Sequence, residues 1–225
     1  MKFKQYLQEK TDDGWGITFI DIDETVFKTF AKIRVIKDGK EVHQLDNQEF
    51  NSYTLKDGES YDFGDFRSAE LFNKTSIPIK QTVSRIKKML SRIRETGSKS
   101  KIIFLTARAD FDDKNTFLKT FEQHGISMDT NHVYVERSGN MKTGTVESRK
   151  KAIMLRYLKE GIYRRARLID DYKPNLKALL EIRDNLPKNI EDKVRKTYNL
   201  SDGEEAIKFW ALWVSPSGKL EEYKG

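Results

Sequence analysis

The chain has 225 residues, of which 34% are charged and 37% apolar, so it has room for one sizeable core and a modest insertion. No apolar run is long enough for a transmembrane helix, the charged N-terminus lacks the apolar stretch of a secretion signal, and the absence of cysteine excludes disulfides and a cysteine nucleophile. We therefore expect a cytoplasmic protein with no membrane and no disulfide partner, and its net charge of +7 favours anionic partners.

The N-terminal segment, residues 1–10, is predicted to be a short amphipathic leader ahead of the core. Its Leu7-Gln8-Glu9 resembles the Leu/Ile-x-Glu protease site that ends the leader of internal head proteins of large tailed phages. That resemblance implies packaging in a phage head as an alternative location. An ordinary N-terminal helical turn is the competing interpretation of the same residues.

The stretch from Ile17 to Thr25 organises the rest of the chain. Its short apolar run, rich in β-branched residues, predicts a buried strand that ends near Asp21. Two carboxylates, Asp21 and Asp23, then stand two positions apart. In open α/β sheets ligands bind at the carboxyl edge of the strands, and this is where both acids are expected.

Residues 27–80 do not alternate strand with helix and are predicted to form an insertion. Two alternating runs, 32–36 and 41–45, flank Asp38-Gly39, which is a strong hairpin signal. A second Asp-Gly pair lies at 57–58 between aromatic-rich pieces, and a short helix is expected from Phe66 to Asn73. The alternative is a hairpin that only packs on the edge of the core.

Strands and helices alternate from Gln81 onward. Apolar residues at three- and four-residue spacing predict helices, and short β-branched runs predict strands. The expected helices are 81–95, 113–124, 149–160, 176–185 and 190–198, and the expected strands are 101–106, 132–135, 166–170, 207–214 and 219–223. This order predicts an α/β fold with a doubly wound parallel sheet, followed by a C-terminal β-hairpin.

Four short motifs follow one another along the chain, next to the predicted strands. They are an Asp-x-Asp-x-Thr after the first strand, a Thr that ends a strand, a Lys on the helix before the last core strand, and paired acids after that strand. Their residues are Asp21, Asp23 and Thr25, then Thr106, then Lys151 with Lys150 as the alternative, then Asp170 and Asp171. In this order they resemble the signatures of the haloacid dehalogenase (HAD) superfamily. Each motif is weak alone, but their order and their positions at strand ends favour this family.

The resemblance implies a division of the chain into parts. A HAD-like Rossmannoid core would comprise residues 11–26 and 81–185, and a small hairpin-containing cap over the active site would comprise 27–80. Residues 186–225 would form a C-terminal helix and β-hairpin extension. Substrate choice would then depend largely on the cap.

The resemblance also implies a Mg²⁺-dependent phosphatase. Asp21 would attack phosphorus to give an aspartyl-phosphate, and Asp23 would act as general acid and base. Neighbouring carboxylates would disfavour the ionised form of Asp23 and so equip it as an acid. Phosphoryl oxygens would be bound by Thr106 and Lys151. The implied metal ligands are Asp21, the backbone carbonyl of Asp23, and Asp170 or Asp171.

The sequence defines the substrate less sharply. Arg108 is expected either to bind a second phosphate or a nucleotide, or to pair with one of Asp110, Asp112 and Asp113. Basic clusters at 85–94 and 149–167 favour a nucleotide or nucleic-acid terminal phosphate, and Asp170-Asp171 resembles the acid pair of polynucleotide 3′-phosphatases and related nucleotidases. A small phosphorylated metabolite is the competing substrate. The rival class is a non-enzymatic, basic phage-head or DNA-binding protein on a HAD scaffold.

Overall fold

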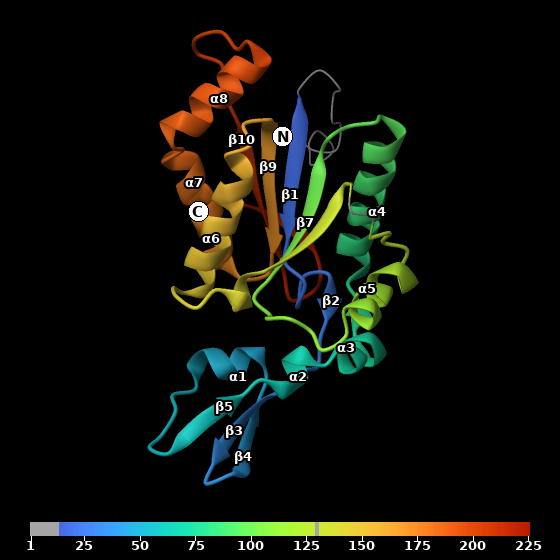
Figure 1. Ribbon diagram of the computed structural model, residues 1–225, viewed down its shortest axis with the longest axis vertical. Coiled ribbons are helices and arrows are strands. Elements are labelled where there is room, and N and C mark those ends of the chain that lie inside the picture. The colour runs from blue at the N-terminus through green and yellow to red at the C-terminus, as the bar shows by residue number, and fades with distance from the viewer. Residues whose placement is uncertain (1–13, 129–130) are drawn as a thin grey trace.

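A computed structural model describes residues 14–128 and 131–225, and its centre is a six-stranded sheet (Figure 1). The strand order is β11-β10-β9-β1-β7-β8, in which only the edge strand β11 is antiparallel to its neighbour. The bounds are β1 (Trp15–Ile20), β7 (Lys101–Thr106), β8 (Val133–Arg137), β9 (Tyr163–Asp170), β10 (Lys208–Val214) and β11 (Leu220–Tyr223). The predicted α/β class with a mainly parallel sheet is confirmed.

Helices cover both faces of this sheet. On one side lie α4 (Lys80–Glu95) and α5 (Lys114–Gln123), and on the other α6 (Val146–Leu158), α7 (Lys173–Asp184) and α8 (Lys188–Tyr198) (Figure 1). Side chains of a strand point to alternate faces, so Ile17 and Phe19 join the core beneath α6, α7 and α8, whereas Ile20 joins the core beneath α4 and α5. Burial on both faces is why the central strands are almost continuously apolar.

The ends of the predicted helices follow local chemistry. Asp113 caps α5, because its Oδ1 accepts hydrogen bonds from the backbone N–H groups of Asn115 (2.9 Å) and Thr116 (3.3 Å). Gly125 follows the end of α5 with a φ of +74°, a left-handed conformation that favours glycine. Both signals are visible in the sequence, and the helix lies within one residue of its predicted bounds at each end.

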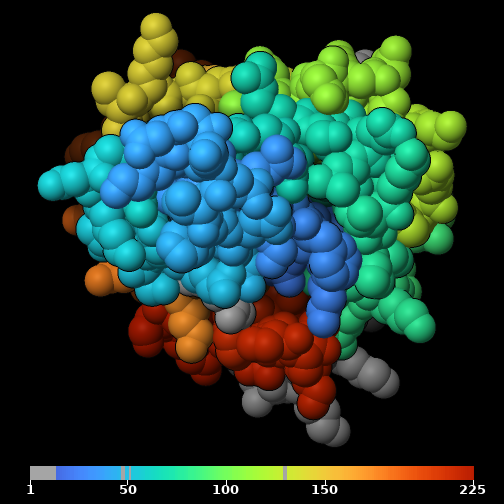
Figure 2. Space-filling model, turned by 90° about the horizontal axis from the view of Figure 1, so that it is seen from below, coloured from blue at the N-terminus to red at the C-terminus, as the bar shows by residue number. Residues whose placement is uncertain are grey.

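The insertion leaves and rejoins the core through a short antiparallel pair, β2 (Phe27–Lys28) with β6 (Ile77–Pro78). Between them a three-stranded antiparallel sheet, in the order β4-β3-β5, is accompanied by three short helices. Their bounds are β3 (Ile33–Lys37), β4 (Lys40–Leu45), α1 (Asn47–Ser52), β5 (Glu59–Asp62), α2 (Gly64–Arg67) and α3 (Ala69–Thr75). Most of this lobe lies beyond the carboxyl ends of the core strands (Figure 1), and it covers a large part of that face in the view from below (Figure 2).

The predicted hairpin of the insertion is confirmed. Asp38 and Gly39 have φ values of +50° and +72°, which fits the twist of a two-residue hairpin turn. The single helix expected from Phe66 to Asn73 is instead two, α2 and α3. Ser68 separates them because its backbone is extended and its side chain accepts a hydrogen bond from the N–H of Leu71, which begins a new helix.

The C-terminal hairpin belongs to the central sheet. Strand β10 pairs in parallel with β9, with Ala211 opposite Leu168, and β11 closes that edge. The segment expected as an extension of the core therefore adds two strands to the sheet. The predicted leader, residues 1–10, lies outside the described residues. Among the residues described, no helix has both the length and the apolar character needed to cross a membrane.

Candidate active site

Three carboxylates meet at the carboxyl ends of β1 and β9. Asp21 follows β1, Asp170 ends β9 and Asp171 follows it, and one carboxylate oxygen from each lies within 4.8 Å of the others. The two strands are parallel neighbours, and the N–H of Asp21 donates to the carbonyl oxygen of Ile169 at 2.9 Å. Asp21 is 7% exposed and Asp170 is fully buried. The structure therefore brings Asp21, one acid of the first motif, together with both acids of the fourth.

A buried lysine joins these acids. Lys150, on α6, places its Nζ 2.6 Å from Oδ1 of Asp21 and 2.9 Å from Oδ2 of Asp170, and it is 2% exposed. Burial lowers the pKa of Lys150, but the charges of Asp170 and Asp21 outweigh this effect and the net pKa is raised. Lys150 is therefore a fixed positive charge at the centre of the cluster.

The choice of Lys151 as the site lysine is wrong. Lys151 points away from the cluster and pairs with Glu181 on α7, with Nζ 2.8 Å from Oε2. Consecutive residues of an α-helix are rotated by about 100°, so only one of the two lysines can face the sheet edge. Here the alternative, Lys150, occupies that position.

The cluster has an excess of negative charge that a cation would balance. Among the described residues, Lys150 is the one cation that pairs with any of the three carboxylates, and it contacts Asp21 and Asp170. Burial raises the pKa of Asp21 well above its usual value; Lys150 opposes this, while Asp170 and Asp171 add to it. Burial, followed by the charge of Asp170, raises the pKa of Asp171 to about 7. Carboxylate oxygens are the ligands that hard divalent cations prefer, so the donor set fits such an ion.

This imbalance makes the stability of the metal-free protein depend on pH. Carboxyl groups with raised pKa hold protons in the folded state that the unfolded chain, with a pKa of about 3.9, has already released. Stability is thus greatest below the unfolded pKa and is lost as the pH rises through the folded pKa of about 7 at Asp171. In EDTA we expect the Tm to fall from about pH 5 to about pH 8, and Mg²⁺ to reduce the fall.

The control is Asp171→Asn, which cannot ionise and should flatten the pH dependence of Tm in EDTA. A Tm that is independent of pH in the wild type, or unchanged in its slope by Asp171→Asn, would contradict the charge excess at this cluster.

Neutral side chains hold the acid pair in place. The hydroxyl of Thr25 donates to Oδ1 of Asp171 (3.1 Å) and accepts from its backbone N–H (3.0 Å). Asn175 donates from Nδ2 to both carboxylate oxygens of Asp170, at 3.0 Å each. The indole N–H of Trp213, on β10, donates to the carbonyl oxygen of Asp171 at 2.8 Å. Asn175 and Trp213 are not among the site residues predicted from the sequence. Of the two, only Asn175, in the first turn after the acid pair, has a local sequence signal.

Asp23 is bound by an arginine instead of lying with the other acids. Arg108 Nε lies 2.9 Å from Oδ2 of Asp23 and Nη2 lies 2.6 Å from Oδ1, and Thr29 donates its hydroxyl to Oδ1 at 2.7 Å. Burial raises the pKa of Asp23, but the charge and hydrogen bonds of Arg108 outweigh burial and the net pKa is lowered. The expectation that neighbouring carboxylates disfavour its ionised form is therefore wrong for this arrangement.

Arg108 also connects the insertion to the core. It is 4% exposed, its Nη1 donates to the carbonyl oxygen of Phe66 at 3.0 Å, and its guanidinium lies 4.5 Å from the centre of the Phe66 ring. The expected pairing of Arg108 with a nearby aspartate is corrected by this geometry, since its partner is Asp23. Binding of a second phosphate or a nucleotide by Arg108 stays a prediction. Asp110, one of the three aspartates expected to pair with Arg108, pairs with Arg137 instead.

Thr106 ends β7 on the same edge of the sheet. Ile20 is opposite Phe104 in the parallel β1–β7 register. Thr106, two residues after Phe104, therefore lies just beyond the end of β1, where Asp21 and Ile22 follow Ile20. It is fully buried, and its hydroxyl oxygen accepts the N–H of Arg108 at 3.1 Å. Within the described part of the chain its hydroxyl donates no hydrogen bond.

No protein-family model matches this chain, and no curated protein matches it. The groups of the site themselves indicate its chemistry. The site combines an ionisable carboxylate beside a buried ammonium, a second carboxylate bound by an arginine, and two further acids at the sheet edge. This combination suits nucleophilic attack on an anionic substrate with help from a cation.

Proposed function

We propose that the protein is a Mg²⁺-dependent phosphomonoester hydrolase of the HAD type that forms an aspartyl-phosphate at Asp21. The observation that carries this proposal is the position of Lys150, whose Nζ contacts both Asp21 and Asp170. A buried ammonium at this place neutralises part of the acid cluster and presents a fixed charge to phosphoryl oxygens. It supports the reading of the four motifs as one site.

The proposed cation fits the donor groups. Asp21, Asp170, Asp171 and the backbone carbonyl of Asp23 would hold Mg²⁺, which when bound supplies positive charge to the transferring phosphoryl group.

In the first step a carboxylate oxygen of Asp21 forms a bond to phosphorus while the bond from phosphorus to the leaving oxygen breaks. The leaving oxygen takes a proton from Asp23 and departs as an alcohol. In the second step Asp23 removes a proton from a water molecule that attacks the phosphorus, which releases inorganic phosphate and restores the Asp21 carboxylate. Lys150 and the hydroxyl of Thr106 stabilise the negative charge on the phosphoryl oxygens throughout.

The contact between Asp23 and Arg108 affects the two steps differently. An ionised Asp23, as its lowered pKa implies, is ready to act as the base of the second step. To act as the acid of the first step it needs a proton and has to exchange Arg108 for the leaving oxygen. Since Arg108 also holds the carbonyl of Phe66 in the insertion, we propose that substrate binding at the insertion shifts Arg108 and frees Asp23.

Asp23→Asn is expected to lower phosphate release from an alkyl phosphate ~10²–10⁴-fold, because the leaving alkoxide and the attacking water both lose their proton-transfer group. An aryl phosphate needs less help with its leaving oxygen, so the variant should release one equivalent of phenol per protein in a fast burst and then stall. Rapid-mixing measurement of phenol and phosphate checks this. An equal loss for both substrates without a burst would contradict the role of Asp23.

A panel of substrates tests the function as a whole. It would contain an aryl phosphate, 5′- and 3′-mononucleotides, sugar phosphates, and DNA or RNA with terminal phosphates, each with Mg²⁺ and with EDTA. We expect release that requires Mg²⁺ and is fastest on a nucleotide or nucleic-acid end. Fastest release from a sugar phosphate would favour a small-metabolite phosphatase, and no release from any member would favour the non-enzymatic, DNA-binding alternative.

A further inference from the structure

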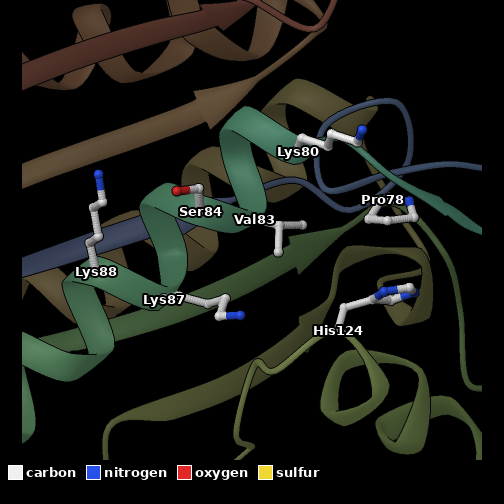
Figure 3. A pocket seen from close by; sticks show the side chains of 7 residues that line it. All are labelled: Pro78, Lys80, Val83, Ser84, Lys87, Lys88 and His124. Carbon is white, nitrogen blue, oxygen red and sulfur yellow. The ribbon is translucent and has the colours of Figure 1, made fainter.

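An open groove lies along α4, outside the acid cluster. It has a volume of about 500 Å³ and is lined by residues of α4 together with Pro78 of β6 and His124 at the end of α5 (Figure 3). Val83 and Lys87 point from α4 toward the side on which His124 lies, while Lys88 points from the opposite side of the helix. None of the four acids of the proposed active site lines this groove.

The groove is basic, and no carboxylate in the described part of the chain pairs with its lysines. Lys80, Lys87 and Lys88 are exposed, and none of them is in an ion pair with another described residue. Lys80 and Lys87, at positions i and i+7 of α4, lie on nearly the same side of the helix about 10 Å apart along its axis, and Lys88 lies about 100° further round the helix. Ser84, between them, adds a hydroxyl donor.

The second basic cluster expected from the sequence does not form a comparable surface. Arg164, Arg165 and Arg167, on β9, are at most 9% exposed, and the first two donate hydrogen bonds to backbone carbonyl oxygens. Lys150 lies inside the acid cluster. Of the two basic clusters expected from the sequence, the one on α4 thus forms the exposed basic surface.

One end of the groove adjoins the segment that carries the catalytic acids. The N–H of Ile79, directly between Pro78 and Lys80, donates to the carbonyl oxygen of Val26 at 2.9 Å, and Val26 follows Asp21 by five residues. His124 at the groove contacts Phe27, with ring centres 5.3 Å apart. A chain lying in the groove would therefore be directed toward the loop that carries Asp21 and Asp23.

We infer that this groove binds the phosphodiester backbone of a single-stranded nucleic acid whose terminal phosphate enters the acid cluster. The inference rests on the proposed phosphomonoester hydrolase function and specifies its substrate class. Small-molecule sites are usually concave and bury most of their ligand, whereas this groove is open and carries spaced positive charges with a hydroxyl between them. Such an arrangement suits successive phosphates of a strand that runs across the surface.

Binding of a fluorescent single-stranded oligonucleotide, followed by anisotropy in EDTA at several salt concentrations, tests this without turnover. The variant is Lys80→Gln/Lys87→Gln/Lys88→Gln. The matched control is Lys177→Gln/Lys188→Gln/Lys196→Gln, which removes the same charge from exposed positions on α7 and α8. We expect weaker binding by the groove variant, with a slope of log K against log salt that is smaller by about 2, since each lost phosphate contact accounts for about 0.7. The control should bind as the wild type does.

Activity measurements separate this inference from the proposed function. The groove variant should release phosphate from a small aryl phosphate at the wild-type rate and from a phosphorylated oligonucleotide more slowly. Charge reversal by Lys87→Glu alone should show the same selectivity if the triple variant folds poorly. The inference is overturned if the wild type binds no oligonucleotide, if the control loses as much affinity as the groove variant, or if polyglutamate competes as well as the oligonucleotide. If the wild type releases no phosphate from the aryl phosphate, the hydrolase function is refuted, whereas the binding result is unaffected.

Discussion

Asp21→Asn is expected to lower kcat for every phosphate ester by ~10⁴-fold or more, because the amide cannot form the aspartyl-phosphate. The side chain keeps its size, and its amide oxygen can still accept the hydrogen bond that Lys150 now donates to Oδ1 of Asp21. The loss should therefore be one of chemistry and not of folding. Phosphate release and the trapping of a phosphorylated protein by acid quench measure it.

The same variant should be at least as stable as the wild type in EDTA. It removes one of the two carboxylates that contact the ammonium of Lys150, and the raised pKa of Asp21 indicates that its ionised form is disfavoured in the metal-free site. The Tm in EDTA should thus be unchanged or higher, and Mg²⁺ should raise it less than in the wild type. Asp110→Asn, which alters a surface carboxylate paired with Arg137, is the matched control and should retain full activity.

Retained turnover in Asp21→Asn would refute an aspartyl-phosphate at this residue. A large fall in Tm together with lost activity would instead indicate that Asp21 mainly holds the fold. The two readouts therefore distinguish the nucleophile from a structural acid.

The edge at which the site forms could be predicted from the sequence because it follows from strand ends alone. Asp21, Thr106 and Asp170 each end or follow a short apolar run, and the carboxyl ends of neighbouring parallel strands meet at one edge of a sheet. Periodicity and chain order are enough to place these residues on the edge. They do not determine which way the side chains turn.

The choice between Lys150 and Lys151 shows the limit of periodicity. Each lysine lies three residues before a buried apolar position of α6, Ile153 for one and Met154 for the other. Because both positions satisfy the helical spacing, the pattern does not decide between them. The decision comes from the packing of α6 against β9 and α7, which only the folded chain contains.

The contact between Arg108 and Asp23 was not accessible for a different reason. The two residues are 85 positions apart, and three aspartates stand much closer to Arg108 in the chain. Each of those is engaged elsewhere: Asp110 pairs with Arg137, Asp112 accepts from the N–H of Ala69, and Asp113 caps α5. The sequence therefore favours pairing of Arg108 with a nearby aspartate, but in the folded chain these three aspartates cap a helix or contact other segments.

Two separate ion pairs thus divide the acids of the Asp-x-Asp-x-Thr motif. Lys150, on α6, pairs with Asp21, and Arg108, in the segment after β7, pairs with Asp23. Alternation of side chains accounts for this, since residues two apart would share a face only if the strand continued, and β1 ends at Ile20. One carboxylate is left beside further acids that suit a cation, and the other is held ionised at the junction with the insertion.

Lys150→Met should destabilise the protein by ~3–5 kcal/mol at about pH 8 in EDTA, because it leaves buried carboxylates without their counter-charge. The cost should shrink toward about pH 5, where the carboxyls that already resist ionisation take up protons, so the stability difference from wild type grows as the pH rises. Urea unfolding at both pH values measures it. Phosphate release should be lost even in variant protein that remains folded.

Lys151→Met is the matched control, one residue away on the same helix. Its partner Glu181 is exposed, so removal of this surface pair should cost little stability and leave phosphate release unchanged. Equal effects of the two substitutions on stability and activity would contradict the assignment of Lys150 to the site. A larger effect of Lys151→Met would assign the role to Lys151 instead.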